Sequence, residues 1–203
     1  MNPSGSWLNP EQLRKLFEAM HPETLLVLDE AYHEYAVHGD YTSGLELTER
    51  IKGHWILLRT FSKSWGLAGL RIGFGVCSST ELRQALDRTR TPFNINSLAQ
   101  IAAKVALDHE DYMLHSVQQT ILQREHLAKE LRSRGYQVGE SLGNFLFINA
   151  NRSSAKFAEE LLKLGTIVKP WPQPGYDTFL RVSIGTPAEN EKFLVDLAQV
   201  EAS

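Results

Sequence analysis

Short, continuous runs of apolar residues alternate with amphipathic stretches in the first part of the chain. The runs at residues 25–28 and 55–58 are apolar throughout, which is typical of strands buried on both faces of a sheet. The segment RIGFGV at residues 71–76 predicts a third strand, and its glycines indicate close backbone packing. Helices are expected at about residues 10–20 and 79–88, where apolar residues recur three and four positions apart. Helices and strands in this order predict an α/β sheet.

The pattern changes near Pro92, where the loop TPFNIN interrupts it. Ser97 is a candidate N-cap for the helix that follows. The apolar residues of this helix recur at helical spacing, so that one inner face is expected to hold Leu98, Ile101, Ala102 and Val105.

Strands and helices mix more closely in the last hundred residues. The remaining elements that the pattern predicts are helices at residues 111–134 and 154–164, strands at residues 145–148, 166–169 and 179–183, and a final helix. Thr186, Pro187 and Glu189 form a capping box that begins this final helix. We therefore expect an α/β part at residues 1–92 and a linking helix with a smaller α+β part at residues 93–203.

Composition narrows the function classes. The 203 residues carry a formal net charge of −3, which gives no electrostatic argument for binding nucleic acid or an anionic membrane. Cys77 is the only cysteine, so no intramolecular disulfide is possible and a reducing, cytoplasmic location is expected. No apolar run reaches the ~18 residues of a membrane span. The seven histidines include no HxxxH pair, and we expect no metal site.

Candidate chemistry gathers where two predicted strands end. Asp29 ends one strand, and Lys63 follows the end of another in the segment RTFSKSWGLAGLRIG. In α/β sheets the ligand crevice lies outside the carboxyl ends of parallel strands. Taken alone, such an aspartate is more often a turn former and such a lysine a solvated charge. Together with the hydroxyls of Thr60 and Ser62 and the guanidinium of nearby Arg71, they suit a phosphate-bearing ligand.

An amine, a carboxylate and a phosphate cradle at one crevice match the needs of pyridoxal 5′-phosphate (PLP). Lys63 would form the Schiff base with its aldehyde. Asp29 would keep the pyridine nitrogen protonated, so that the ring can accept electrons.

Several motifs carry a family resemblance. The stretch TFSKSWGLAGLRIG, with LDEAYHEY before it, resembles the fold-type-I PLP-dependent aminotransferases and within them the histidinol-phosphate aminotransferases. The other matching motifs, in the family's order, are NPSG at residues 2–5, PFNIN at residues 92–96 and LRVSIGTPAEN at residues 180–190. The resemblance implies the second half of the large PLP-binding domain, with a mostly parallel sheet, at residues 1–92. It implies the small C-terminal domain at residues 93–203.

The resemblance also implies residue roles near the cofactor. Lys63 would be the Schiff-base lysine and the proton shuttle, and Asp29 would pair with the pyridinium nitrogen. Tyr32 and Asn2 would donate hydrogen bonds to the phenolate oxygen of PLP, which tunes the pKa of the lysine linkage. A packing aromatic is the alternative for Tyr32.

Further implied roles concern anionic groups. Ser62 and Arg71, together with Thr60, would hold the phosphate of PLP. Arg181 would bind a carboxylate or phosphate of the substrate, and a surface salt bridge is the alternative for it.

Two functions stay open at this point. The first is an aminotransferase that converts histidinol phosphate and 2-oxoglutarate to imidazole acetol phosphate and glutamate, with aromatic aminotransfer or phospho-amino-acid decarboxylation as sister activities. The second is a non-catalytic remnant, because the family's chains are longer and their part before NPSG is not in this sequence. By resemblance we expect a homodimer, or a partner chain that supplies the N-terminal half.

Overall fold

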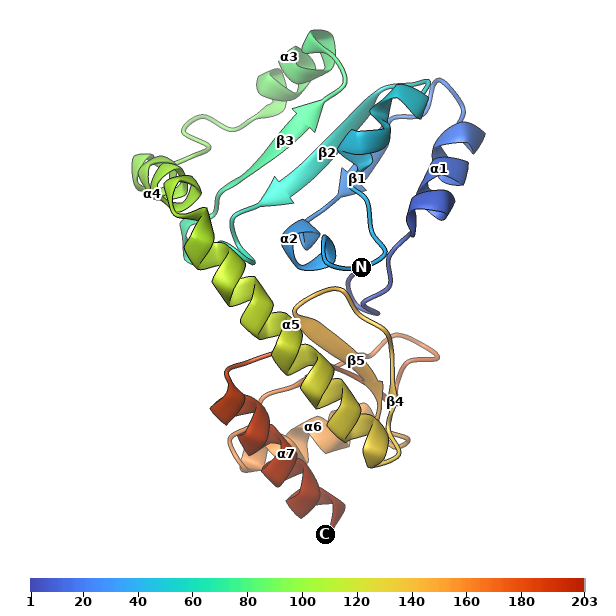
Figure 1. The fold of residues 1–203 in the computed structure, drawn as a ribbon, viewed down its shortest axis with the longest axis vertical. Coiled ribbons are helices and arrows are strands. Elements are labelled where there is room, and N and C mark those ends of the chain that lie inside the picture. Colours follow the sequence, from blue (N-terminus) through green and yellow to red (C-terminus); the bar gives the residue numbers. More distant parts are fainter. Residues whose placement is uncertain (203) are drawn as a thin grey trace. The chain divides into compact units, whose positions relative to one another are not determined.

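The computed structural model describes residues 1–202 of the 203. The chain forms two compact units (Figure 1). One consists of Leu8–Ser116, and the other combines Met1–Trp7 with the residues from Val117 onward. Compact units are defined by contacts within this chain, so the division into family domains near residue 92 stays a prediction.

The first unit is built on a three-stranded sheet in the order β1-β2-β3. Its strands are β1 (Leu26–Asp29), β2 (Trp55–Thr60) and β3 (Gly73–Cys77). Strands β1 and β2 are parallel, with Asp29 opposite Leu58, whereas β3 runs antiparallel to β2. All three predicted strands are confirmed, but β3 begins at Gly73. Arg71 has a φ of 57°, in the left-handed region, and therefore belongs to the turn before the strand.

The helices of this unit are α1 (Pro10–Ala19), α2 (His33–Ala36), α3 (Thr80–Thr89), α4 (Ser97–Asp108) and the first part of α5 (Glu110–Ser133). Two 3₁₀ helices, η1 (Gly44–Arg50) and η2 (Ala68–Leu70), complete it. The sequence did not predict α2, η1 or η2, because three to seven residues are too few to show an apolar period. Asn9 caps α1 in a capping box with Gln12, which confirms the predicted start of that helix.

Two expectations for α4 are wrong. The side chain of Asn96, and not that of Ser97, accepts the capping bond from the backbone N–H of Ala99 at 2.8 Å. The helix buries its small residues Ala99 and Ala103, whereas the predicted inner face is open: Leu98 is 71%, Ile101 63% and Val105 50% exposed. The apolar period locates a stripe on the helix but does not tell what covers it.

The second unit is a four-stranded antiparallel sheet in the order β4-β5-β7-β6. The strands are β4 (Gln137–Val138), β5 (Phe145–Asn149), β6 (Lys169–Pro170) and β7 (Phe179–Ser183). The predicted strands at residues 145–148 and 179–183 are confirmed. The one expected at residues 166–169 begins only at Lys169, and the two-residue β4 was not predicted.

Helices α5, α6 (Ser154–Lys163) and α7 (Pro187–Glu201) pack on one face of this sheet (Figure 1). Their shared core includes Phe157, Leu161 and Leu197 from helices and Ile148 and Leu180 from strands, all fully buried. The predicted capping box of Thr186 and Glu189 begins α7. This unit therefore closes a core of its own.

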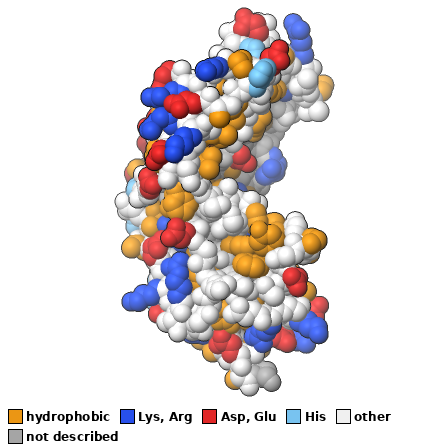
Figure 2. All heavy atoms as spheres, turned by 90° about the vertical axis from the view of Figure 1, so that its right-hand side faces the viewer, with side chains coloured by type: hydrophobic (Ala, Val, Ile, Leu, Met, Phe, Trp, Pro, Cys, Tyr) orange, Lys and Arg blue, Asp and Glu red, His pale blue; other side chains and the backbone are white. Residues whose placement is uncertain are grey.

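Exposed apolar side chains distinguish the first unit. The large apolar residues left exposed on or beside its strands and on α4 are Leu25, Val27, Leu58, Phe74, Leu98, Ile101, Val105 and Leu107. Figure 2 shows hydrophobic side chains in patches among charged ones on the face that it draws.

Candidate active site

The loop that carries Lys63 joins β2 to β3 and is held by its own backbone. The N–H of Phe61 donates to the carbonyl of Ile72 at 3.2 Å, which continues the β2–β3 pairing by one step. The N–H of Leu67 donates back to the carbonyl of Phe61 at 2.8 Å, so the loop closes on itself. Lys63 lies at the turn of this loop, exposed to solvent, beyond the carboxyl end of β2.

Lys63 and Tyr32 lie together. The Nζ atom of Lys63 is 5.4 Å from the centroid of the Tyr32 ring, within the range of a cation–π contact. Tyr32 directly precedes α2 and is nearly buried, at 9% exposure. The amine is therefore held beside a phenol whose own position is fixed by packing.

Asp29 ends β1, next to the end of β2. Its Oδ1 atom accepts a hydrogen bond from the backbone N–H of Ala31 at 3.0 Å, a turn that carries the chain from β1 toward α2. The carboxylate is exposed, as expected for a group at the carboxyl end of a parallel pair.

The three residues expected to hold a phosphate lie at the end of β2 and in the loop to β3. The backbone N–H of Ser62 donates to Oγ1 of Thr60 at 3.1 Å. Arg71 is exposed, and its guanidinium donates to the carbonyl of Ala68 at 2.8 Å. The left-handed backbone of Arg71 turns the chain there, next to the start of β3.

The other two predicted residues, Asn2 and Arg181, belong to the second unit and contact each other. The guanidinium of Arg181 donates to Oδ1 of Asn2 at 2.8 Å and lies over the ring of Phe145 at 5.2 Å. Because Oδ1 accepts from arginine, the amide of Asn2 presents its N–H₂ as the remaining donor. The Nε atom of Arg181 is buried and has no partner among residues 1–202. An orphaned guanidinium donor fits an anionic ligand.

A second cation stands beside Arg181. Lys169 on β6 is its cross-strand partner, and its Nζ lies over the ring of Trp171 at 5.4 Å. Two like charges directly opposite on a sheet repel each other. An anion bound between them would remove that repulsion.

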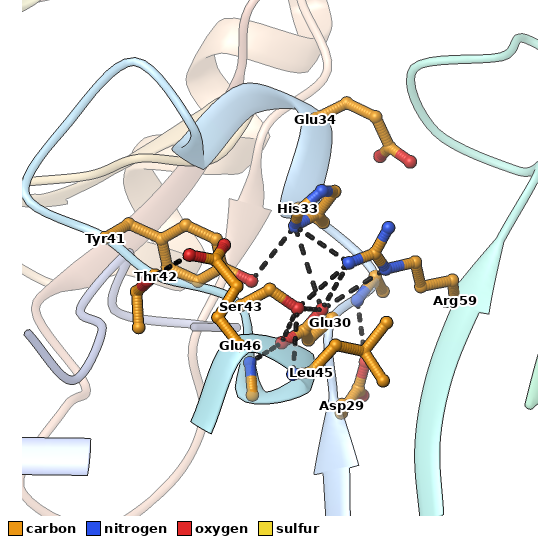
Figure 3. A network of polar contacts seen from close by, with 12 residues as sticks. Asp29, Glu30, His33, Glu34, Tyr41, Thr42, Ser43, Leu45, Glu46 and Arg59 are labelled. Atoms are coloured by element: carbon orange, nitrogen blue, oxygen red, sulfur yellow. Dashed lines mark hydrogen bonds and ion pairs between the residues drawn. The ribbon is translucent and has the colours of Figure 1, made fainter. Parts of the chain in front are cut away.

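A polar network joins the ends of β1 and β2 (Figure 3). Its centre is Glu30, whose side chain is only 8% exposed and which ion-pairs with Arg59 at 3.0 Å. The Glu30 carboxylate also accepts from the hydroxyl of Ser43 at 2.9 Å and from the N–H of Gly44 at 2.6 Å. These charge-assisted bonds satisfy a carboxylate that is nearly out of water, and they hold η1 against the strand ends.

His33 is part of this network, and its side chain is only 17% exposed. Burial and the nearby Arg59 guanidinium lower the pKa of His33. Its Nδ1 faces the guanidinium of Arg59 at 3.3 Å and the hydroxyl of Tyr41 at 3.2 Å. Arginine can only donate, so Nδ1 is an acceptor and the ring is neutral.

Glu34 makes a separate set of contacts. Its two oxygens accept from the hydroxyl of Ser64 at 2.9 Å and from the indole N–H of Trp65 at 3.2 Å. These donors directly follow Lys63 in the chain. The roles of Glu30, Glu34 and Arg59 were not predicted from the sequence. The sequence shows them only as charged residues beside apolar strand ends. Their partners are distant in sequence, so no local pattern indicates the contacts.

Comparison with known proteins identifies the family of the chain. The profile of the family described as aminotransferase class I and II matches residues 1–197. The chain belongs to the class I and II aminotransferases. It is 49% identical over 202 residues to histidinol-phosphate aminotransferase 3 of Rhizobium meliloti, which covers 100% of this chain and 55% of that protein. It is 52% identical to histidinol-phosphate aminotransferase 1 of Mesorhizobium japonicum, over 98% of this chain and 54% of that protein.

Solved aminotransferase structures share the fold. The histidinol-phosphate aminotransferase of Sinorhizobium meliloti, in complex with pyridoxal-5′-phosphate, aligns with a TM-score of 0.85 and 28% identity, over 98% of this chain and 54% of that chain. The enzyme of Clostridium acetobutylicum aligns with a TM-score of 0.90 and 25% identity, over 99% of this chain and 61% of that chain. The predicted fold class, part of the fold-type-I large domain with a small α+β domain, is confirmed. The chain spans about half the length of the curated relatives that it matches.

Neither a membrane-spanning helix nor a metal site is found within residues 1–202. None of the helices within residues 1–202 is long and apolar enough to cross a membrane. Over the same residues, no group of three or more metal-ligating side chains could hold an ion.

Proposed function

We propose that the chain is part of a PLP-dependent histidinol-phosphate aminotransferase of histidine biosynthesis, a cytoplasmic pathway. The observation that carries this proposal is the position of Lys63 beside Tyr32, at the carboxyl ends of the parallel strands β1 and β2. Family membership and the PLP-bound relative support the choice of cofactor.

The donor set of the first unit fits PLP chemically. Lys63 offers the amine that attaches the aldehyde, and the Asp29 carboxylate suits the pyridine nitrogen. Thr60, Ser62 and Arg71 offer hydroxyls and a guanidinium for the phosphate. Bound PLP supplies an electron sink through its pyridine ring.

The chain's own residues would divide the remaining work. Lys63 would move the proton between the two carbons that exchange it, since its amine is the base on this loop. Tyr32 would donate from its hydroxyl to the phenolate oxygen, together with the N–H₂ of Asn2. Arg181 would bind the carboxylate or phosphate of histidinol phosphate or 2-oxoglutarate through its orphaned donor, and Lys169 adds positive charge beside it.

The first unit also has surfaces that suit a partner. A cavity of about 770 Å³ lies over β2 and β3 and is lined in part by Ile56, Leu58, Phe74 and Leu86. Since large apolar side chains stay exposed on this unit, we propose that a second chain covers them, as a homodimer or as a separate N-terminal half. The length of the relatives supports the second arrangement.

The test of the cofactor site is reductive trapping. Purified protein incubated with PLP and then reduced with borohydride should carry a stable PLP adduct on Lys63, found by peptide mass spectrometry. Lys63→Ala should abolish the adduct, and Lys52→Ala, which removes an exposed lysine of the same unit, should leave it unchanged. Equal labelling of Lys52 and Lys63 would contradict the assignment.

A non-catalytic remnant is the second candidate, favoured by the chain's coverage of only 55% of its relative. The two candidates differ in transfer of the amino group from glutamate to bound PLP. We expect transfer when the chain is mixed with a separately produced N-terminal half of a relative, and loss of that transfer with Lys63→Ala. If Lys63 forms the adduct but no amino group is transferred, whether the chain is alone or mixed with the N-terminal half, the remnant is favoured.

A further inference from the structure

Glu34 ties the loop of Lys63 to α2. Its carboxylate binds two donors from that loop, the hydroxyl of Ser64 and the indole N–H of Trp65, at 2.9 and 3.2 Å. Glu34 itself lies in the first turn of α2, two residues after Tyr32. A single carboxylate therefore links the segment that carries Tyr32 to the residues that follow Lys63.

Burial and packing hold both donors of these contacts in place. Ser64 is only 6% exposed, so its hydroxyl depends on Glu34 for a strong acceptor. The Trp65 ring packs against Phe61, with centroids 5.6 Å apart, and Phe61 is 5% exposed. This packing directs the indole N–H toward the carboxylate. Bonds to a charged acceptor are shorter and stronger than neutral ones.

These bonds close a ring of contacts around the amine. The ring runs from Tyr32 along α2 to Glu34, across to Ser64, back one residue to Lys63, and across to Tyr32 through the contact of 5.4 Å. The cation–π contact alone is soft, because a lysine side chain has four rotatable bonds and its amine is exposed here. The bonds to Glu34 fix the backbone from which that side chain extends.

We propose that Glu34 is a positioning residue for Lys63: it holds the loop of Lys63 against α2 and so sets the place of the amine beside Tyr32. Glu34 does not touch the reacting atoms in this account. The inference rests on the proposed function, since it assigns a purpose to the position of the amine. The hold of Glu34 on the loop can be tested without the cofactor.

The first measurement is hydrogen–deuterium exchange of the chain without PLP. Glu34→Ala should speed exchange of the amides of Gly66 and Leu67 about tenfold, the effect of losing a net hydrogen-bond contribution to a charged group. Glu34→Gln should give a smaller increase, because its amide oxygen can accept from one donor while its N–H₂ faces the other. Glu46→Gln is the matched control: this carboxylate also accepts from a hydroxyl, that of Thr42, but lies on η1.

A double-mutant cycle sharpens the assignment. Ser64→Ala removes the buried donor and should raise exchange less than Glu34→Ala does. In the double variant Ser64→Ala/Glu34→Gln, the exchange rate should rise by less than the product of the two single effects, since both substitutions weaken the same contact between Glu34 and Ser64. This cycle also replaces Glu34→Ala if that variant does not fold.

The second measurement is the rate at which borohydride-fixed PLP accumulates on Lys63. We expect about a tenfold slower attachment in Glu34→Ala, with no change in Glu46→Gln. Unchanged exchange in Glu34→Ala overturns the proposal, and so does faster exchange with attachment as fast as in the wild type. If the wild type forms no adduct at all, the proposed function fails, while the exchange data still decide whether Glu34 holds the loop.

Discussion

The two units differ in how far their own helices cover the apolar residues of their sheets. In the second unit the residues of β5 and β7 that face the helices are buried, among them Leu146, Ile148 and Leu180. In the first unit the strands leave Val27 53% and Phe74 47% exposed. The apolar content of the strands is similar, so the difference lies in what covers them. The helices of the second unit cover its sheet. In the first unit, polar contacts such as the Glu30–Arg59 pair hold the strand ends in place.

The largest expected effect tests the closed core. Phe157→Ala should destabilise the second unit by about 4 kcal/mol, because it removes a fully buried ring and leaves a cavity. Phe74→Ala in the first unit should cost less than about 1 kcal/mol, since half of that ring is already in water. Urea unfolding, followed by exchange protection in each unit, measures both. Similar losses for the two variants would mean that Phe74 is covered in solution.

The next effect tests the polar order of the first unit. Glu30→Ala should destabilise it by about 3 kcal/mol, because Arg59 would stay behind as a nearly buried, unpaired charge. Glu18→Ala breaks an exposed pair with Arg50 in the same unit, and about 0.5 kcal/mol is expected. The midpoints of urea unfolding give the difference. If the two substitutions cost the same, the network around Glu30 is not what holds the strand ends together.

The sequence predicts the features that depend on neighbouring residues, and it does not predict those that depend on distant contacts. Continuous apolar runs located β1 and β2, and local chemistry located the cap at Thr186, because these signals lie within a few residues. The exposure of Val27 could not be predicted, because it depends on what packs against the strand. In the same way, the motif around Lys63 indicated an amine at a strand end. It could not indicate Glu34, whose partners lie 30 and 31 residues away in sequence.

A smaller effect is expected when helix caps are removed, and it can be compared between the two units. Asn96→Ala should destabilise α4 by about 1.5 kcal/mol, because the side chain accepts from Ala99 and also donates to the carbonyl of Leu70. Thr186→Ala removes the cap at the start of α7 and the bond from its hydroxyl to the exposed Glu189 carboxylate, and about 1 kcal/mol is expected. Thermal unfolding by circular dichroism measures the two losses. A smaller loss for Asn96 than for Thr186 would show that its bond to Leu70 adds nothing.

The smallest effect concerns pH, and it should appear in the first unit. The pKa of His33 is lowered in the folded chain, chiefly by burial and then by Arg59, so the unfolded chain binds the proton more readily. Stability should therefore be full above the ordinary pKa of about 6.5 and decline as the pH falls toward the lowered value. The groups around the ring that modulate this are Glu30, Glu34, Glu46, Arg59 and Tyr41. Urea midpoints between pH 7.5 and 5 measure the decline.

His33→Gln keeps an acceptor for Arg59 but cannot be protonated in this range. The part of the acid-induced decline that belongs to His33 should therefore disappear in this variant. Protection of β5 and β7 should not differ between the variant and the wild type, because His33 belongs to the other unit. A wild type and a variant with the same pH dependence would mean that the neutral ring contributes nothing to folding. The order at the strand ends would then rest on the Glu30–Arg59 pair and its hydrogen bonds alone.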